Sequence, residues 1–162
     1  MRIGRILKIV VIVLLVGFLL IQLVPYGRAH DNPAVVSEPN WDSPETRALA
    51  ERACFDCHSN ETVWPWYSNV APVSWLVQHD VDEGRQFINF SDWINSGEVD
   101  ELSEVVNRGE MPPFQYFPTH PEAKLTDAER AALADGLAAT VAQSPATTGR
   151  EHGEHEEHEE GE

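Results

Sequence analysis

The sequence predicts an all-α protein in which a small helical domain follows a single transmembrane helix. Apolar residues recur at helical spacing in several segments, and some of these segments open with residues that cap helices. No segment shows the strict alternation that is typical of a half-buried β-strand. The 162 residues leave room for one ordinary domain with appendages.

The N-terminal segment is an apolar run that is long enough to cross a bilayer. Residues 9–24 are broken only by Gly17 and Gln22, and no charged residue lies between Lys8 and Arg28. A span of this length matches the thickness of the hydrocarbon core. The segment therefore predicts a transmembrane helix.

Basic residues on the N-terminal side of this run predict its orientation. Arg2, Arg5 and Lys8 precede the run, and positive charges mark the cytoplasmic side. We expect residues 1–8 in the cytoplasm and an anchor at 9–27. The rest of the chain then lies on the outer side of the membrane, facing the periplasm or exterior. A cleaved signal peptide is the alternative interpretation, and it also exports the domain.

The remaining sequence divides into a linker, a helical domain and a tail. Residues 28–41 lack periodicity and are expected to be a linker, and 143–162 are polar and acidic and are expected to be disordered. The domain at 42–142 should contain a helix capped by Asp42 or Ser43 that runs to the cysteines. Further helices should run from Pro72 to about Arg85, from Glu98 to Arg108, and from Thr126 onward. The last helix has a capping box, Thr126 with Glu129, and an apolar stripe of Leu133, Leu137 and Val141.

The charge balance restricts the partners. The formal net charge is −16, and Arg2, Arg5 and Lys8 all precede the apolar run, so the part of the chain beyond it is more acidic still. Nucleic-acid binding requires a basic face, so we exclude that class of partner. His152, His155 and His158 lie among glutamates in the tail, where weak chelation of a divalent metal is an alternative to a solvated tail.

Residues 54–58 read Cys-Phe-Asp-Cys-His, which is the attachment signature of c-type haem. Two thiols three residues apart lie on one side of a helical turn, where they can reach the two vinyl groups of one porphyrin. The next residue, His58, then lies beneath the iron with Nε2 as its ligand. Its Nδ1–H requires an acceptor, which we expect to be a backbone carbonyl in the following loop.

Three other interpretations of Cys54 and Cys57 are open. A redox-active dithiol normally lies at a helix N-terminus after a strand, whereas these cysteines follow a predicted helix. A disulfide across two residues closes a very short loop and stabilises little. A zinc site requires a fourth ligand beside Cys54, Cys57 and His58, and the sequence has no second pair at finger spacing.

Met111 is the predicted second axial ligand. Apart from the initiator it is the only methionine, and Pro112 and Pro113 follow it directly. A thioether on a stiff loop can be held against iron, and His/Met ligation suits electron transfer. A gap-filling core methionine is the alternative role. His120 and His79 are the alternative ligands.

Several side chains near the motif are predicted to contact the cofactor. Trp64, Trp66 and Tyr67 follow it closely, and aromatic rings cover much of a haem disc per residue. The same rings are equally suited to an ordinary core. Arg85 is a predicted partner for a haem propionate.

With these residues identified, the sequence resembles the haem-binding domain family of bacterial membrane-anchored cytochrome c-like proteins. The resemblance covers about Trp41 to Ala142 and rests on the stretches 54–62, 64–68, 71–76, 89–91, 110–113 and 120–125. It implies a cytochrome c-like helical fold, one covalent haem c on Cys54 and Cys57, and His58 as an axial ligand. The acidic tail is not part of this pattern.

The leading hypothesis for function is a membrane-anchored electron carrier that serves an unidentified redox protein partner. A haem-based sensor or ligand-binding protein is the second hypothesis. A peroxidase-like enzyme ranks last, because the sequence offers no identifiable acid–base pair beside an open iron position. No small-molecule substrate is predicted.

Overall fold

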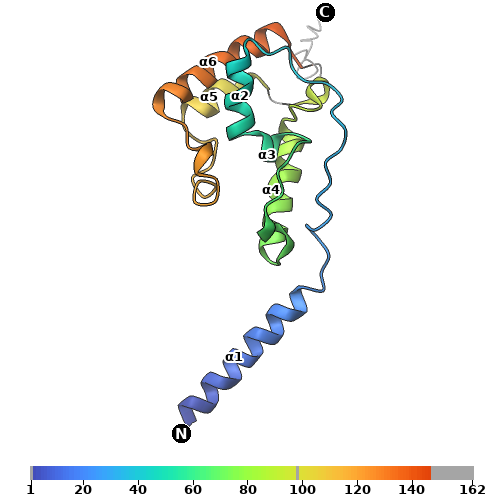
Figure 1. Ribbon diagram of the computed structural model, residues 1–162, viewed down its shortest axis with the longest axis vertical. Helices are drawn as coiled ribbons and strands as arrows, with labels where there is room; N and C mark the ends of the chain where they lie inside the picture. The colour runs from blue at the N-terminus through green and yellow to red at the C-terminus, as the bar shows by residue number, and fades with distance from the viewer. Residues whose placement is uncertain (1, 98, 147–162) are drawn as a thin grey trace, which may run out of the picture.

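The computed structural model describes residues 2–97 and 99–146, and within these ranges the chain is all-α, as predicted. The described residues form α-helices and short 3-10 helices, with one isolated bridge between Ser37 and Asp92. Figure 1 shows a small helical domain at one end and a single long helix, α1, that extends away from it.

Helix α1 (Arg2–Ile21) is a candidate membrane span. Twenty residues extend about 30 Å, and the stretch Ile3–Ile21 is apolar enough to cross a bilayer. The prediction of one N-terminal apolar helix is confirmed, but the helix begins and ends earlier than the expected anchor at 9–27. The residue after it, Gln22, hydrogen-bonds to the backbone of Ala71 in the domain.

The segment 28–41 is packed along the domain, so its description as a linker is wrong. The side-chain amide of Asn60 donates to the carbonyl of Ala34 at 3.0 Å. The backbone N–H of Val36 donates to the carbonyl of Ser91 at 2.8 Å. These long-range hydrogen bonds fix an extended segment that shows no periodicity in the sequence.

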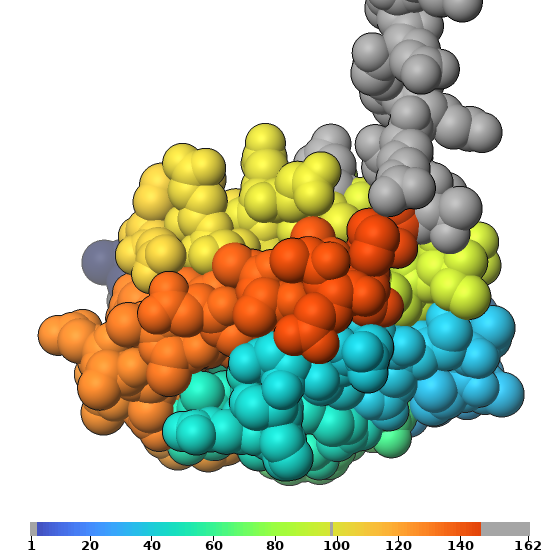
Figure 2. All heavy atoms as spheres, turned by 90° about the horizontal axis from the view of Figure 1, so that it is seen from above, coloured from blue at the N-terminus to red at the C-terminus, as the bar shows by residue number. Residues whose placement is uncertain are grey.

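Helices α2 (Pro44–Ala53) and α6 (Asp127–Gln143) begin at the predicted caps. Ser43 accepts a hydrogen bond from the backbone of Thr46, and Thr126 and Glu129 form the full capping box. A Cβ at Gly136 would overlap the side chain of Thr46, so glycine allows the two helices to pack closely. Figure 2 shows α6 side by side with α2.

The central helices are more broken than the sequence predicts. The expected helix through the cysteines stops at Ala53, and a separate turn, α3 (Phe55–His58), follows. The expected helix at 98–108 is a 3-10 turn, η3 (Val99–Glu101), followed by α5 (Leu102–Asn107). The remaining elements are η1 (Trp66–Asn69), α4 (Val73–Phe87), η2 (Trp93–Asn95) and η4 (Pro121–Ala123).

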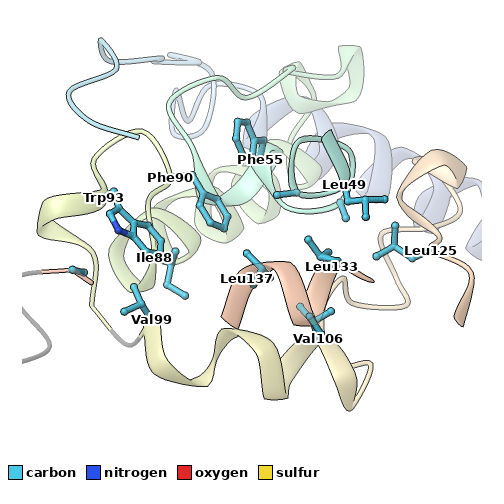
Figure 3. Close-up of a cluster of buried hydrophobic side chains, with 14 residues drawn as sticks. Leu49, Phe55, Ile88, Phe90, Trp93, Val99, Val106, Leu125, Leu133 and Leu137 are labelled. Atoms are coloured by element: carbon cyan, nitrogen blue, oxygen red, sulfur yellow. The ribbon is translucent and has the colours of Figure 1, made fainter. Parts of the chain in front are cut away.

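The core joins the aromatic side chains after α4 to the apolar stripe of α6. Phe90 stacks on Trp93 with ring centroids 5.8 Å apart, and Leu133 and Leu137 are fully buried, as predicted (Figure 3). Val141 of the predicted stripe is partly buried against the same cluster. Phe55 of α3 belongs to this core, which therefore fixes the turn that carries the cysteines.

The folded domain continues past the boundary expected at 142. The indole N–H of Trp93 donates to the carbonyl of Ser144 at 2.6 Å, and Ala146 is buried. The rest of the expected tail, including its three histidines, lies outside the described residues.

Candidate functional site

The motif at 54–58 forms one helical turn that is packed on the core through Phe55. The backbone N–H of His58 donates to the carbonyl of Cys54 at 2.9 Å, which closes the turn. The ring of Phe55 is buried and stacks on Phe90 at 5.5 Å between centroids. Cys54, Cys57 and His58 are half-buried. The turn therefore leaves both thiols and the imidazole next to one another and accessible to a cofactor.

The imidazole of His58 is held by helix α4. Its Nδ1 lies 2.9 Å from the carbonyl oxygen of Gly84 and 3.2 Å from that of Ile88. Carbonyl oxygens accept only, so Nδ1 carries the proton and Nε2 keeps its lone pair for a metal. The expected carbonyl acceptor is confirmed, but its expected location in the loop that follows the motif is wrong, because Gly84 lies in α4 and Ile88 is the residue that ends it.

The sequence interpretation missed Gly84, which makes this arrangement possible. A Cβ at this position would overlap the carbonyl carbon and oxygen of Cys57. Only glycine lets α4 approach the backbone of the motif closely enough for the Gly84 carbonyl to reach His58. The signal in the sequence was an isolated glycine within a predicted helix, which suggests close backbone approach.

The two thiols lack the properties of a redox-active pair. Burial raises the pKa of Cys54 to about 12, and the nearby Cys57 adds to this effect. Burial also raises the pKa of Cys57 to about 11, with further contributions from Asp80 and Asp56. Reactive dithiols require a lowered pKa, because the thiolate is the nucleophile. Both cysteines are free, and in the described ranges no three His, Cys, Asp or Glu side chains gather as a metal site.

Asp56 links the motif to the loop that carries Met111. One carboxylate oxygen accepts the hydroxyl of Tyr116, and the other accepts the backbone N–H of Val63 at 2.8 Å. The ring of His120 stacks on Tyr116 at 3.8 Å, and its Nε2 lies 4.0 Å from Asp56. Burial, and then the hydrogen bond to Asp56, raise the pKa of Tyr116, which keeps the phenol protonated. The sequence interpretation did not find this contact, which joins residues 60 positions apart.

Met111 lies on the loop between α5 and η4 with 41% of its surface exposed. It borders a hollow of about 60 Å³ whose lining includes Phe114, Phe117 and Leu125. An exposed thioether on a loop is available to a ligand, so ligation by Met111 stays a prediction. Of the alternatives, His79 is exposed on α4 and lies 3.4 Å from Glu83, while His120 is engaged with Tyr116 and Asp56.

The predicted aromatic contacts lie in two places. Trp64 stacks on His30 at 4.7 Å and donates to the side chain of Asn32. Trp66 and Tyr67 belong to η1, where the two rings meet edge to face at 5.9 Å. Contact of these rings with a cofactor stays a prediction.

Arg85 is committed to contacts within the protein. Its Nε donates to the carbonyl of Ser59 at 2.7 Å, and its terminal nitrogens donate to Thr62, Asn32 and the carbonyl of Asp31. The guanidinium therefore ties α4 to the loop after the motif and to the segment 28–41. Its role as a propionate partner stays a prediction, and this structural role was missed.

The motif residues fit a haem. The side chains at 54, 57 and 58 offer two free thiols and an imidazole whose Nε2 is left open by the contacts of Nδ1. These are the donors that a thioether-linked porphyrin with an axial histidine requires. The fold and site thus define a small all-α haem-binding domain.

Comparison with known families supports the same class. The model of the haem-binding domain family matches residues 16–139, which is most of the chain. The chain belongs to this family. Searches of curated proteins and of solved structures gave no match.

Proposed function

We propose that the chain is a membrane-anchored c-type cytochrome that carries electrons on the outer side of a bacterial inner membrane. The observation that carries the proposal is His58, whose Nδ1 is engaged by Gly84 and Ile88 while Nε2 remains available. Two free thiols lie on the same helical turn. The family supports haem binding, and the thiols argue for covalent attachment.

Cys54 and Cys57 would hold the porphyrin through thioether bonds, and His58 would bind its iron. When bound, the haem supplies one-electron chemistry through its iron. The protein's part is to orient the imidazole through α4 and to keep the turn rigid through the buried Phe55. Such a site transfers electrons without a substrate pocket, so we propose a carrier with a redox protein partner rather than an enzyme.

The proposed anchoring rests on α1. The helix is long and apolar enough for one crossing, and Arg2, Arg5 and Lys8 are the basic residues at its N-terminal end. This orientation places the haem domain outside the cytoplasm, where the maturation of c-type cytochromes occurs. Residues 1–8 would then face the cytoplasm.

The carrier model is tested with the purified full chain after maturation in a cell that attaches haem. Acid–acetone should fail to extract the haem, and the iron should cycle reversibly between two oxidation states. With Met111 as the sixth ligand, the oxidised protein should show the near-infrared band of methionine-ligated haem, and the reduced protein should bind no carbon monoxide. Met111→Ala should lose the band and gain carbon monoxide binding. Irreversible redox behaviour, or haem that acid–acetone extracts, would contradict the proposal.

A haem-based sensor is the second candidate function. It is favoured by the exposure of Met111, because a loop residue that is 41% exposed can yield its position to an external ligand. Ready binding of carbon monoxide by the unmodified reduced protein would support the sensor over the carrier.

A further inference from the structure

One end of the domain is uncharged although the chain as a whole is strongly acidic. Residues 63–78 contain no Asp, Glu, Lys, Arg or His, while the chain has a formal net charge of −16. These residues include η1 (Trp66–Asn69) and the start of α4 (Val73–Phe87). We name η1 and the first turn of α4 the tip.

The tip is fixed to the end of α1. The side-chain amide of Gln22, the residue after α1, donates to the carbonyl of Ala71 at 2.8 Å and accepts from its N–H at 3.0 Å. A Cβ at Gly27 would overlap the carbonyl of Ser74, so the chain also packs closely on the first turn of α4. Figure 1 shows the start of α4 as the part of the domain nearest the end of α1.

The tip exposes large apolar side chains where the chain leaves α1. Trp66 is 79% exposed, Leu76 is 59% exposed and Val73 is 41% exposed. Leu76 follows Val73 by three residues, so both lie on one face of α4. Tryptophan with aliphatic neighbours, and without charge, is the composition that membrane–water interfaces favour.

We propose that the tip inserts into the lipid headgroup region beside the point where α1 leaves the bilayer. This inference rests on the proposed membrane anchoring. The occupant of the surface is lipid because the tip is continuous with a candidate span and because its lack of carboxylates avoids repulsion from anionic lipids. Arg28, which donates to Gln22 at 2.8 Å, places a guanidinium at the same boundary, where lipid phosphates lie.

Insertion would fix the orientation of the haem site relative to the membrane. The tip includes Ser74 in the first turn of α4, and Gly84 contacts the motif ten residues further along this helix. Ten residues of α-helix extend about 15 Å. The site therefore stays within a short distance of the bilayer surface and in reach of a redox partner in the same membrane. Trp66 then contacts lipid, in place of the haem contact that the sequence predicts.

The experiment measures membrane depth at three positions of the matured full chain in vesicles of phosphatidylcholine and phosphatidylglycerol. Trp66→Cys, Ile94→Cys and Val13→Cys are each spin-labelled, and collision with oxygen is compared with collision with a water-soluble nickel complex. Ile94 is the matched control, since it is apolar and 54% exposed. It lies in η2, whose Trp93 binds the end of α6, on the part of the domain remote from α1 in Figure 1. Val13 reports on α1 itself.

The label at position 66 should show a several-fold higher ratio of oxygen to nickel accessibility than the label at position 94. The label at position 13 should be deeper still. If position 13 is buried in lipid but the label at position 66 is as accessible to nickel as the label at position 94, insertion of the tip is contradicted while the anchoring stands. A water-accessible label at position 13 would instead overturn the anchoring. A changed haem spectrum in Trp66→Cys, with that of Ile94→Cys unchanged, would indicate that Trp66 contacts the haem and would contradict insertion.

Discussion

The two candidate axial ligands differ in how the chain holds them. His58 is fixed by the backbone carbonyls of Gly84 in α4 and of Ile88 directly after it, and this 15-residue helix contacts the backbone of the motif at Gly84. Met111 lies half-exposed on the loop between α5 and η4, and a hydrogen bond from Tyr116 to Asp56 ties this loop to the motif. The fold therefore orients the imidazole of His58 without a cofactor, whereas Met111 lies exposed on a loop.

The largest expected effect is the loss of His58. His58→Ala removes the imidazole that α4 orients, so the chain should hold little haem after maturation and lose most of its haem absorption. In contrast, Met111→Ala should keep covalent haem and lose only the sixth ligand. The measurement is the absorption spectrum of both purified variants. Equal spectra for the two variants would contradict the proposed difference between His58 and Met111.

Gly84→Ala should destabilise the domain although alanine favours helices. Helix propensity alone predicts a gain of about 1 kcal/mol. The added Cβ would overlap the backbone of Cys57, and such overpacking costs about 1–3 kcal/mol. We expect a net loss in the free energy of unfolding, together with a weakened Gly84–His58 contact.

The measurement for Gly84→Ala is unfolding by urea, followed by helical circular dichroism. Gln86→Ala in the same helix is the control, because Gln86 is exposed and its replacement meets no backbone. If Gly84→Ala is at least as stable as this control, the close approach of α4 to the backbone of Cys57 does not stabilise the site.

The link between the loop and the motif should contribute less. Tyr116→Phe removes the hydrogen bond to Asp56, which should cost about 1 kcal/mol in the free energy of unfolding. It should also increase ligand exchange at Met111 while leaving covalent haem intact. Tyr26→Phe is the matched control, because Tyr26 also faces an aspartate, Asp82, at an exposed 3.4 Å contact. An equal effect of the two substitutions would contradict the proposal that the Tyr116–Asp56 hydrogen bond holds the Met111 loop to the motif.

The smallest effect concerns the start of α6, which follows the Met111 loop and η4. The backbone N–H of Thr126, and then Arg52, lower the pKa of the Glu129 carboxyl from 4.5 to about 2. A lowered carboxyl pKa gives stability that is present above about pH 4.5 and is lost as the pH falls toward 2. Glu129→Gln should flatten the dependence of stability on pH in this window.

Arg52→Gln provides the intermediate case for this prediction, because the contact with Thr126 remains. Thermal unfolding at several pH values compares the two variants with the unmodified chain. An unchanged pH dependence in Glu129→Gln would contradict the assigned origin of the acid sensitivity.

Local signals in the sequence predicted the parts of the fold that depend on local chemistry. The caps at Ser43 and Thr126 and the apolar stripe at Leu133 and Leu137 need only neighbouring residues, and the structure confirms them. The motif at 54–58 identified the candidate haem site because its spacing carries the chemistry.

Contacts between distant residues decided the features that the sequence interpretation missed. The segment 28–41 has no periodicity, yet hydrogen bonds to Asn60 and Ser91 order it. Gly84 has a role only because α4 crosses the motif, and Tyr116 only because its loop returns to Asp56. Such pairings join residues that are 26 or more positions apart, beyond the range of any local pattern.

The most direct test is the mass of the matured full chain, followed by the mass of the peptide that contains residues 54–58. We expect one haem per chain, attached to this peptide through both sulfur atoms, with no free thiol. A chain from a cell competent in haem attachment that carries two free thiols, or a disulfide between them, would contradict the proposed cytochrome.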